Sequence, residues 1–193
     1  SGSGVKWLDR LRANAWERFS ELGFPSVKDE EWKYTNVAPI ARMQFEGSSP
    51  TTGLELPDLG VPEARESQLV FVNGKLRIDL SAVTAIPAGV VVENLSQAIA
   101  GDKGDVVRQH LGRAADYVSS GFTALNTAFI SEGAFIHIAR NTVVDTPIHL
   151  LFISDGTERV SFPRVLIVAE ENSSAGIIES YLSVSDAQYF TNA

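Results

Sequence analysis

The chain has 193 residues, no cysteine and a formal charge of -8 at pH 7, and 44% of its residues are hydrophobic. This is the composition of an ordinary globular protein and argues against an intrinsically disordered chain. The absence of cysteine excludes disulfides, thiolate metal sites and cysteine nucleophiles within the chain. The net negative charge argues against nucleic-acid binding.

The sequence also argues against export and against membrane insertion. No apolar run approaches the roughly 20 residues that a membrane-spanning helix needs, and the first residues form a Gly/Ser run without the apolar segment of a secretory signal. We therefore expect a cytoplasmic protein.

The first regular element is predicted to be an amphipathic helix. Apolar residues recur at steps of three and four along one face, namely Leu8, Leu11, Ala15, Phe19 and Leu22. Gly23 suits a helix C-cap, and Pro25 cannot continue the helix. The charges on the remaining surface have mixed signs, so we expect the apolar face to pack on the core or on a partner and not on a membrane.

The next segment, residues 25–37, combines a helix-capping serine with two aromatic residues. Ser26 is predicted to cap a short helix, with Asp29 near the positive end of the helix dipole. Trp32 and Tyr34 are predicted to pack beneath the first helix, because their acidic neighbours disfavour stacking on nucleic-acid bases.

Residues 47–68 are rich in Gly, Ser, Thr and Pro and are predicted to form a linker or surface excursion. After them, Asn73 and Gly74 separate two short apolar runs. This dipeptide predicts a β-hairpin with a type I′ turn, because both residues tolerate positive φ angles.

Short elements of both kinds are predicted in the middle of the chain. Residues 89–92 have the pattern of a strand. Asn94 or Ser96 is predicted to cap a helix that runs to Ala100, and a further helix is predicted over 105–111.

From Phe122 onward, short apolar runs alternate with clusters of turn residues. The runs are ALNTAFI, AFIHIA, PIHLLFI, RVLIVA and GIIESYL, and their patterning predicts strands. The last four runs, marked by Ile136, Ile148, Val165 and Ile178, follow one another at short and unequal intervals. No helix is predicted between these runs, which leaves an antiparallel sandwich and a β-helix as candidate architectures. A solenoid needs caps, and none follows the last run, so we expect the stack to be incomplete within this chain.

No catalytic, cofactor-binding or metal-binding residue is predicted. The glycine–lysine turn at 101–104 lacks the spacing of a phosphate-binding loop, and no G-x-S-x-G nucleophile motif is present. His110 is expected at a helix end, where an imidazolium suits the dipole. The adjacent Glu170 and Glu171 are predicted to be solvated turn residues and not an acid–base pair.

His137 and His149 lie in neighbouring apolar runs. In stacked strands they could lie one above the other, with Glu179 or Asp155 adding a carboxylate to a metal site. Two imidazoles without a cysteine make a weak ligand set, and partly exposed strand residues are the favoured interpretation.

Four segments, in order along the chain, carry a family resemblance: GFPSVKDEEWKYTNV at 23–37, LVFVNGKL at 69–76, FTALNTAFISEGAFIHI at 122–138 and TPIHLLFI at 146–153. They resemble the SufB/SufD family of iron–sulfur cluster assembly proteins, the SufD branch more closely than the SufB branch. EEWKYT and ALNTAF are the most specific motifs.

The resemblance implies a mixed α and β fold. An N-terminal helical region (1–46), a linker or surface excursion (47–68) and a small α/β segment with the hairpin (69–118) would be followed by the first coils of a right-handed parallel β-helix (119–193). The chain would then be the N-terminal part of a longer protein.

The resemblance also implies a function. The chain would belong to a non-catalytic scaffold subunit of the SufBCD complex, with SufB and the ATPase SufC as partners through regions largely beyond this chain. It would hold no cofactor of its own, while the iron–sulfur cluster is handled by the full complex, and a homodimer is left open. The alternatives are a β-helix carbohydrate-active enzyme and a stand-alone β-sandwich binding module.

Overall fold

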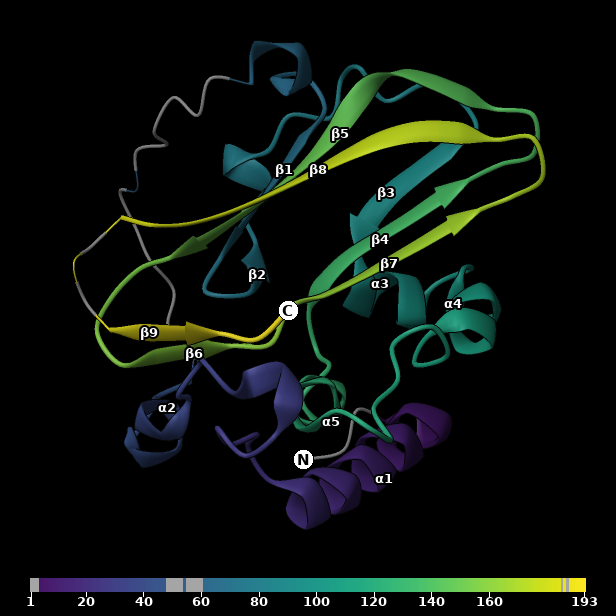
Figure 1. Ribbon diagram of the computed structural model, residues 1–193. Coiled ribbons are helices and arrows are strands. Elements are labelled where there is room, and N and C mark those ends of the chain that lie inside the picture. The colour runs from purple at the N-terminus through teal and green to yellow at the C-terminus, as the bar shows by residue number, and fades with distance from the viewer. Residues whose placement is uncertain (1–3, 48–53, 55–60, 185, 187) are drawn as a thin grey trace.

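The computed structural model describes residues 4–47, 54, 61–184, 186 and 188–193. It is a mixed α/β structure whose α-helices lie along one side of sheets that contain both parallel and antiparallel strand pairs (Figure 1). Most of the predicted linker, 47–68, lies outside the described residues. Within the part of the chain that is described, no helix is long and apolar enough to cross a membrane.

The predicted N-terminal helix is confirmed as α1 (Lys6–Leu22), with Leu8 and Ala15 fully buried. Gly23 ends the helix with a φ of 67°, and its N–H donates to the Phe19 carbonyl. The helix packs against a second helix whose first residue, Gly121, lies close to it. A Cβ on Gly121 would come within 2.2 Å of the Gly23 carbonyl oxygen, so this close approach requires glycine.

The prediction for the two aromatic residues after α1 is partly wrong. Ser26 and Asp29 form a hydrogen-bonded turn before the single 3-10 turn η1 (Glu30–Trp32), and α2 (Ala38–Arg42) follows. Trp32 packs on Phe122, with ring centroids 5.1 Å apart, and therefore contacts a later helix. Tyr34 is 91% exposed, with Lys33 over its ring, and so does not anchor the segment beneath α1.

The hairpin is confirmed. Strand β1 (Gln68–Val72) follows the 3-10 turn η2 (Pro62–Ala64), pairs antiparallel with β2 (Lys75–Leu76) and is followed by η3 (Ile78–Leu80). Asn73 and Gly74 have φ angles of 49° and 81°, as a type I′ turn requires.

The next elements also match the sequence predictions. Strand β3 (Val90–Asn94) leads into α3 (Leu95–Ala100), and α4 (Gly104–His110) follows. The side chain of Asn94 accepts a hydrogen bond from the Ser96 N–H at 2.8 Å and so caps α3.

The strand predicted for the run ALNTAFI is wrong, because these residues form α5 (Gly121–Ala128). Ser120 caps this helix by accepting from the Thr123 N–H. Four consecutive residues of the helix are buried, from Ala124 to Thr127. The helix lies between α1 and the sheets, and a short run that is buried on several sides has no periodicity that separates helix from strand.

The other four runs form four strands, which stack in two successive sets together with two short strands that no run predicted. The first set is β4 (Gly133–Ile138), β5 (Val143–Ser154) and β6 (Arg159–Ser161), and the second set is β7 (Arg164–Ala169), β8 (Ser174–Ser183) and β9 (Tyr189–Thr191). Each strand of the first set pairs in parallel with its counterpart in the second: β4 with β7, β5 with β8 and β6 with β9. These parallel pairs rule out the antiparallel sandwich for this region.

The N-terminal half of the chain covers the other edge of the first set. β3 pairs antiparallel with β4, β1 pairs parallel with β5, and Glu46 forms a parallel bridge to Arg159 in β6. The strands predicted for segment 69–118 therefore extend the same sheets as the strands of 119–193. The largest core cluster lies between the sheets, and a second cluster lies between β4, β7 and the helices α1, α3 and α4.

Candidate functional site

His137 and His149 do not lie above each other, so the stacked arrangement considered from the sequence is wrong. His137 belongs to β4 and lies beside Val168, whereas His149 belongs to β5 and lies beside Ile178. The strand that stacks on β4 is β7 and not the next strand along the chain, so the two histidines belong to different sheets of the same strand set. Among the described residues, no group of three or more His, Asp or Glu side chains could hold a metal ion.

His137 links a helix end to the second strand set. Its Nε2 lies 2.9 Å from a Glu170 carboxylate oxygen, and its Nδ1 lies 3.3 Å from Lys103 Nζ. The Arg140 backbone N–H and the His137 ring both donate to Glu170 and hold the pKa of that carboxyl below its ordinary value. Glu171 is paired with Arg140 at 2.9 Å. Both glutamates are thus turn residues with separate partners.

His149 is fully buried and bridges three strands. Its Nδ1 lies 2.8 Å from Gln68 Nε2 of β1, and its Nε2 lies 2.9 Å from the Ser180 hydroxyl of β8. A neutral ring satisfies both contacts, because Nδ1 accepts from the amide while Nε2–H donates to the hydroxyl. Burial lowers the pKa of His149 below its ordinary value.

A buried polar network attaches α5 to the second strand set. Arg164 donates to the Asn126 side chain at 2.7 Å and to the Thr127 hydroxyl at 3.1 Å. The Asn126 amide donates in turn to the carbonyls of Pro163 and Asn192. Asn126 and Thr127 belong to the ALNTAF motif, so this motif has a structural role that the sequence alone did not indicate.

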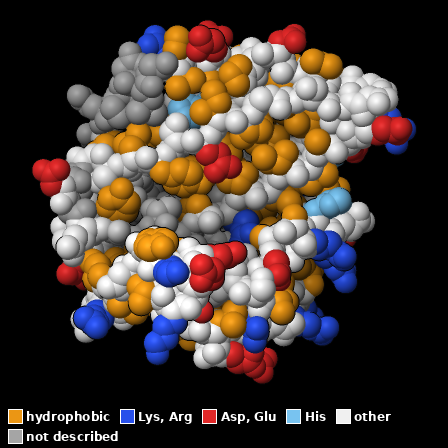
Figure 2. Space-filling view, viewed as in Figure 1, with side chains coloured by type: hydrophobic (Ala, Val, Ile, Leu, Met, Phe, Trp, Pro, Cys, Tyr) orange, Lys and Arg blue, Asp and Glu red, His pale blue; other side chains and the backbone are white. Residues whose placement is uncertain are grey.

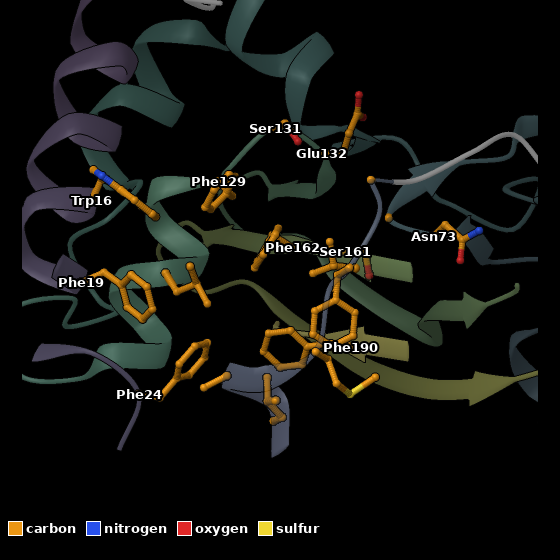
Figure 3. A pocket seen from close by; sticks show the side chains of 18 of the residues that line it. Trp16, Phe19, Phe24, Asn73, Phe129, Ser131, Glu132, Ser161, Phe162 and Phe190 are labelled. Atoms are coloured by element: carbon orange, nitrogen blue, oxygen red, sulfur yellow. The ribbon is translucent and has the colours of Figure 1, made fainter. Parts of the chain in front are cut away.

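A cavity with a volume of about 640 Å³ lies between the N-terminal helices and the β6–β9 pair (Figure 3). Its wall is mainly aromatic and aliphatic: Trp16, Phe19, Phe24, Ile40, Ala41, Met43, Phe45, Leu125, Phe129, Val160, Phe162 and Phe190. Its polar lining comes from Gly47, Asn73, Gly74, Lys75, Ser131, Glu132 and Ser161. Such a composition, apolar with a few polar groups, is typical of small-molecule sites.

Contacts between the rings hold the aromatic wall of this cavity in place. Phe129, just after α5, stacks on Phe162 with centroids 4.7 Å apart and meets the Trp16 ring of α1 edge-on at 5.9 Å. Phe162 meets Phe190 of β9 nearly perpendicularly at 6.3 Å. Offset stacks and edge-to-face contacts are the favoured aromatic geometries, so these rings stabilise one another.

The hairpin turn forms the polar side of the cavity. The Asn73 side chain donates to the Asp155 carbonyl and accepts from the Asp155 N–H, both at 2.9 Å, which fixes the turn to the end of β5. The adjacent Gly74 lies close enough to Ser161 that an added Cβ would sit 3.1 Å from the serine Cβ. The turn and β6 therefore pack directly on each other.

Sequence analysis missed this cavity because its lining comes from many separate parts of the chain. No motif joins these residues. The signal that could have been used is weak: single phenylalanines stand just after the ends of elements, Phe24 and Phe129 after helices and Phe162 after β6.

Comparison with known proteins decides the family. The family model for the SufBD protein N-terminal region matches residues 2–150, which is most of the chain. The chain belongs to the SufBD family. The match agrees with the resemblance found in the sequence and covers the EEWKYT and ALNTAF motifs and the hairpin.

Three curated relatives illustrate the match. An iron–sulfur cluster assembly SufBD family protein of Synechocystis is 31% identical over 189 residues, covering 96% of this chain and 41% of the relative. SufD of Bacillus subtilis is 27% identical, covering 92% of the chain and 42% of SufD. SufB of the same organism is 28% identical, covering 90% of the chain and 40% of SufB. The chain thus spans about two fifths of these relatives, and the identities do not separate the SufD branch from the SufB branch.

Proposed function

We propose that this chain is the N-terminal part of a non-catalytic scaffold subunit in iron–sulfur cluster assembly, in a complex with SufB-type and SufC-type partners. The observation that carries the proposal is the family match over residues 2–150, together with relatives named as iron–sulfur cluster assembly proteins. The SufD assignment and the cytoplasmic location remain predictions from the sequence.

The fold supports a platform role. A parallel β-helix requires each strand of one coil to pair in parallel with its counterpart in the next coil. The three parallel strand pairs between the first and second sets have this arrangement. We propose that residues 133–191 form the first coils of a right-handed parallel β-helix. On this proposal the helices and β1–β3 cover the starting end of the β-helix, and the second strand set presents the end on which further coils would stack.

The residues argue against the alternative of a carbohydrate-active enzyme. Such an enzyme needs a pair of carboxyl groups facing one cleft. Here Glu179 accepts a hydrogen bond from the Tyr181 hydroxyl at 2.8 Å and does not line the cavity. Among the described residues that line the cavity, Glu132 is the single carboxylate, and it accepts a hydrogen bond from Asn94. The chain contains no cysteine that could hold a cluster.

Co-expression tests the proposal. The 193-residue chain and a version extended to the length of its relatives would each be tagged and expressed with SufB and SufC. We expect the extended form to co-purify with both partners and the short form to bind SufC weakly or not at all. If neither form retains SufB or SufC, the scaffold proposal is wrong. Tight SufC binding by the short form would show that the ATPase contact lies within these residues.

Anaerobic reconstitution with iron and sulfide provides a second measurement. We expect the 193-residue chain to remain colourless, because its donor set has no thiolate. Stable cluster absorbance in the visible range would contradict the assignment of this chain as scaffold only.

A further inference from the structure

The aromatic cavity is preformed and of ligand size. Its volume of about 640 Å³ lies within the range of roughly 300–1,000 Å³ that small-molecule sites occupy. The rings that line it are held by α1, α5, β6 and β9 and by one another, so little of the wall has to become ordered when a ligand binds. Nothing in the proposed scaffold function uses this cavity.

The ring geometry favours a planar aromatic ligand. The rings are alternately perpendicular and stacked: Trp16 against Phe129 at 90°, Phe129 against Phe162 at 18°, and Phe162 against Phe190 at 88°. All four rings line the same cavity, and their planes differ in orientation. A flat conjugated ligand can stack on such rings or meet them edge-on, which adds to the binding from buried area, whereas an alkyl chain gains from the buried area alone.

The charges at the cavity favour an anion. Lys75 is the cation of the described lining, and its ammonium group has no ion-pair partner among the described residues. Glu132 is the anion of that lining, and the Asn94 amide donates to its carboxylate at 2.5 Å. The Glu132 carboxylate thus already has a hydrogen-bond donor within the protein, whereas the Lys75 ammonium, at the polar end formed by the hairpin turn, is the charged group left to meet a ligand.

From these observations we propose that the cavity binds a planar aromatic anion, with its ring system against the side chains of Trp16, Phe129, Phe162 and Phe190 and its negative group toward Lys75. Figure 3 shows the labelled aromatic side chains around one space, with Ser161 beside Phe162, Ser131 and Glu132 above the rings and Asn73 to the right.

The test uses two probes that share a ring system. 1-Anilinonaphthalene-8-sulfonate carries a sulfonate, and N-phenyl-1-naphthylamine is its neutral counterpart. Titration of the folded 193-residue chain, followed by probe fluorescence and by calorimetry, is expected to show one site. We expect the sulfonate to bind about tenfold more tightly than the neutral probe, as one charge-assisted contact permits.

Two variants test the charged end and the aromatic wall of the site separately. Both positions are accessible to solvent, so the substitutions should preserve the fold. Lys75→Glu should weaken binding of the sulfonate about tenfold and leave the neutral probe unchanged. Phe129→Ala, at a position that is 45% exposed, should weaken both probes several-fold because the stack on Phe162 is lost. Circular dichroism confirms that each variant is folded.

Matched controls separate the cavity from other apolar surface. Lys28→Glu makes the same charge change away from the cavity, and Ile167→Ser reduces the exposed apolar surface of the second strand set. Neither should change probe affinity. The proposal is overturned if Ile167→Ser abolishes binding while Lys75→Glu does not, if both probes bind equally, or if sodium decanoate displaces the sulfonate as well as naphthalene-1-sulfonate does.

Discussion

The residues of β4 and β7 pair in register over their whole length, yet every residue of β4 is buried and none of β7 is. The same contrast separates β5, with a run of seven buried residues, from β8, with none. The sequences do not explain it, because RVLIVA of β7 is at least as apolar as GAFIHI of β4.

The difference lies in the number of neighbouring strands. β4 lies between β3 and β7, and β5 lies between β1 and β8, whereas β7 and β8 are edge strands of their sheets in the described structure. Hydrophobic side chains accordingly gather over β7 and β8 on the face seen in Figure 2, and the large apolar side chains of the second set that remain exposed include Ile167, Tyr181 and Tyr189. In this fold, burial of a strand is set by what stacks on it.

An aromatic column shows the contrast within the core. Phe71, Phe152 and Tyr181 stack in register through three strands, with successive centroids 4.9 Å apart. Phe71 and Phe152 are buried, but Tyr181, at the end of the column, is 47% exposed. Its hydroxyl donates to Glu179, and partial burial beside that carboxylate raises the pKa of the phenol.

Glycine substitutions should give the largest difference between the two strand sets. Gly133 of β4 has a φ of 142°, and a Cβ there would lie 2.0 Å from the Arg164 carbonyl oxygen. Gly133→Ala is therefore expected to cost about 3 kcal/mol or more, as measured by urea unfolding. Gly176→Ala in β8 is the control, because its added Cβ would sit at an ordinary 3.6 Å from Pro147. Equal costs for the two variants would refute the close-packing argument.

The attachment of α5 to the second strand set is expected to have a smaller but clear effect. Asn126→Ala removes one of the two side-chain acceptors of Arg164 and leaves two carbonyls without this donor, so we expect a loss of about 2–3 kcal/mol in the free energy of unfolding. Asn14→Ala, at an exposed position of α1, should be neutral. If Asn126→Ala left the free energy of unfolding unchanged, strand pairing alone would hold β7 in place.

Acidification should lower the free energy of unfolding through His149, which lies in the first strand set. Burial lowers the folded-state pKa of His149 below its ordinary 6.5, so below about pH 6.5 the unfolded chain binds more protons and folding stability decreases as the pH decreases. The loss continues until the pH reaches the folded-state pKa. Urea midpoints at pH 7 and pH 5 should differ less for His149→Gln than for the unmodified chain. His110→Gln, at an exposed position, serves as the control. If both variants reduced the difference between the two urea midpoints equally, His149 would not be the source of the pH dependence.

The sequence predicted the local elements better than their stacking. Period-two runs and turn residues located most of the longer strands, and the Asn73-Gly74 dipeptide located the hairpin, because these signals are local. ALNTAFI was misassigned because a short buried helix has no distinguishing period. His137 and His149 were misplaced because consecutive runs enter different sheets, β4 beside β7 and β5 beside β8. The third strand of the first set, β6, is too short to stand out within the turn residues that surround it, so the sequence did not indicate that β4 is covered by β7.

The candidate site could not be predicted at all. The family resemblance came from contiguous motifs, whereas the cavity depends on rings that the fold assembles from distant positions such as Trp16, Phe129 and Phe190. Residue type suggests that a phenylalanine will be buried, but not which others it will meet.

The most direct test of the stacking account compares two isoleucines that are partners in register. Ile136 of β4 is 0% exposed and Ile167 of β7 is 41% exposed. Replacing each by alanine removes the same atoms, and urea unfolding measures the change in the free energy of unfolding. We predict a loss of about 3–4 kcal/mol for Ile136→Ala, against about 1 kcal/mol for Ile167→Ala. Equal losses would contradict the claim that stacked neighbours, and not strand sequence, set the burial and the stability of each strand set.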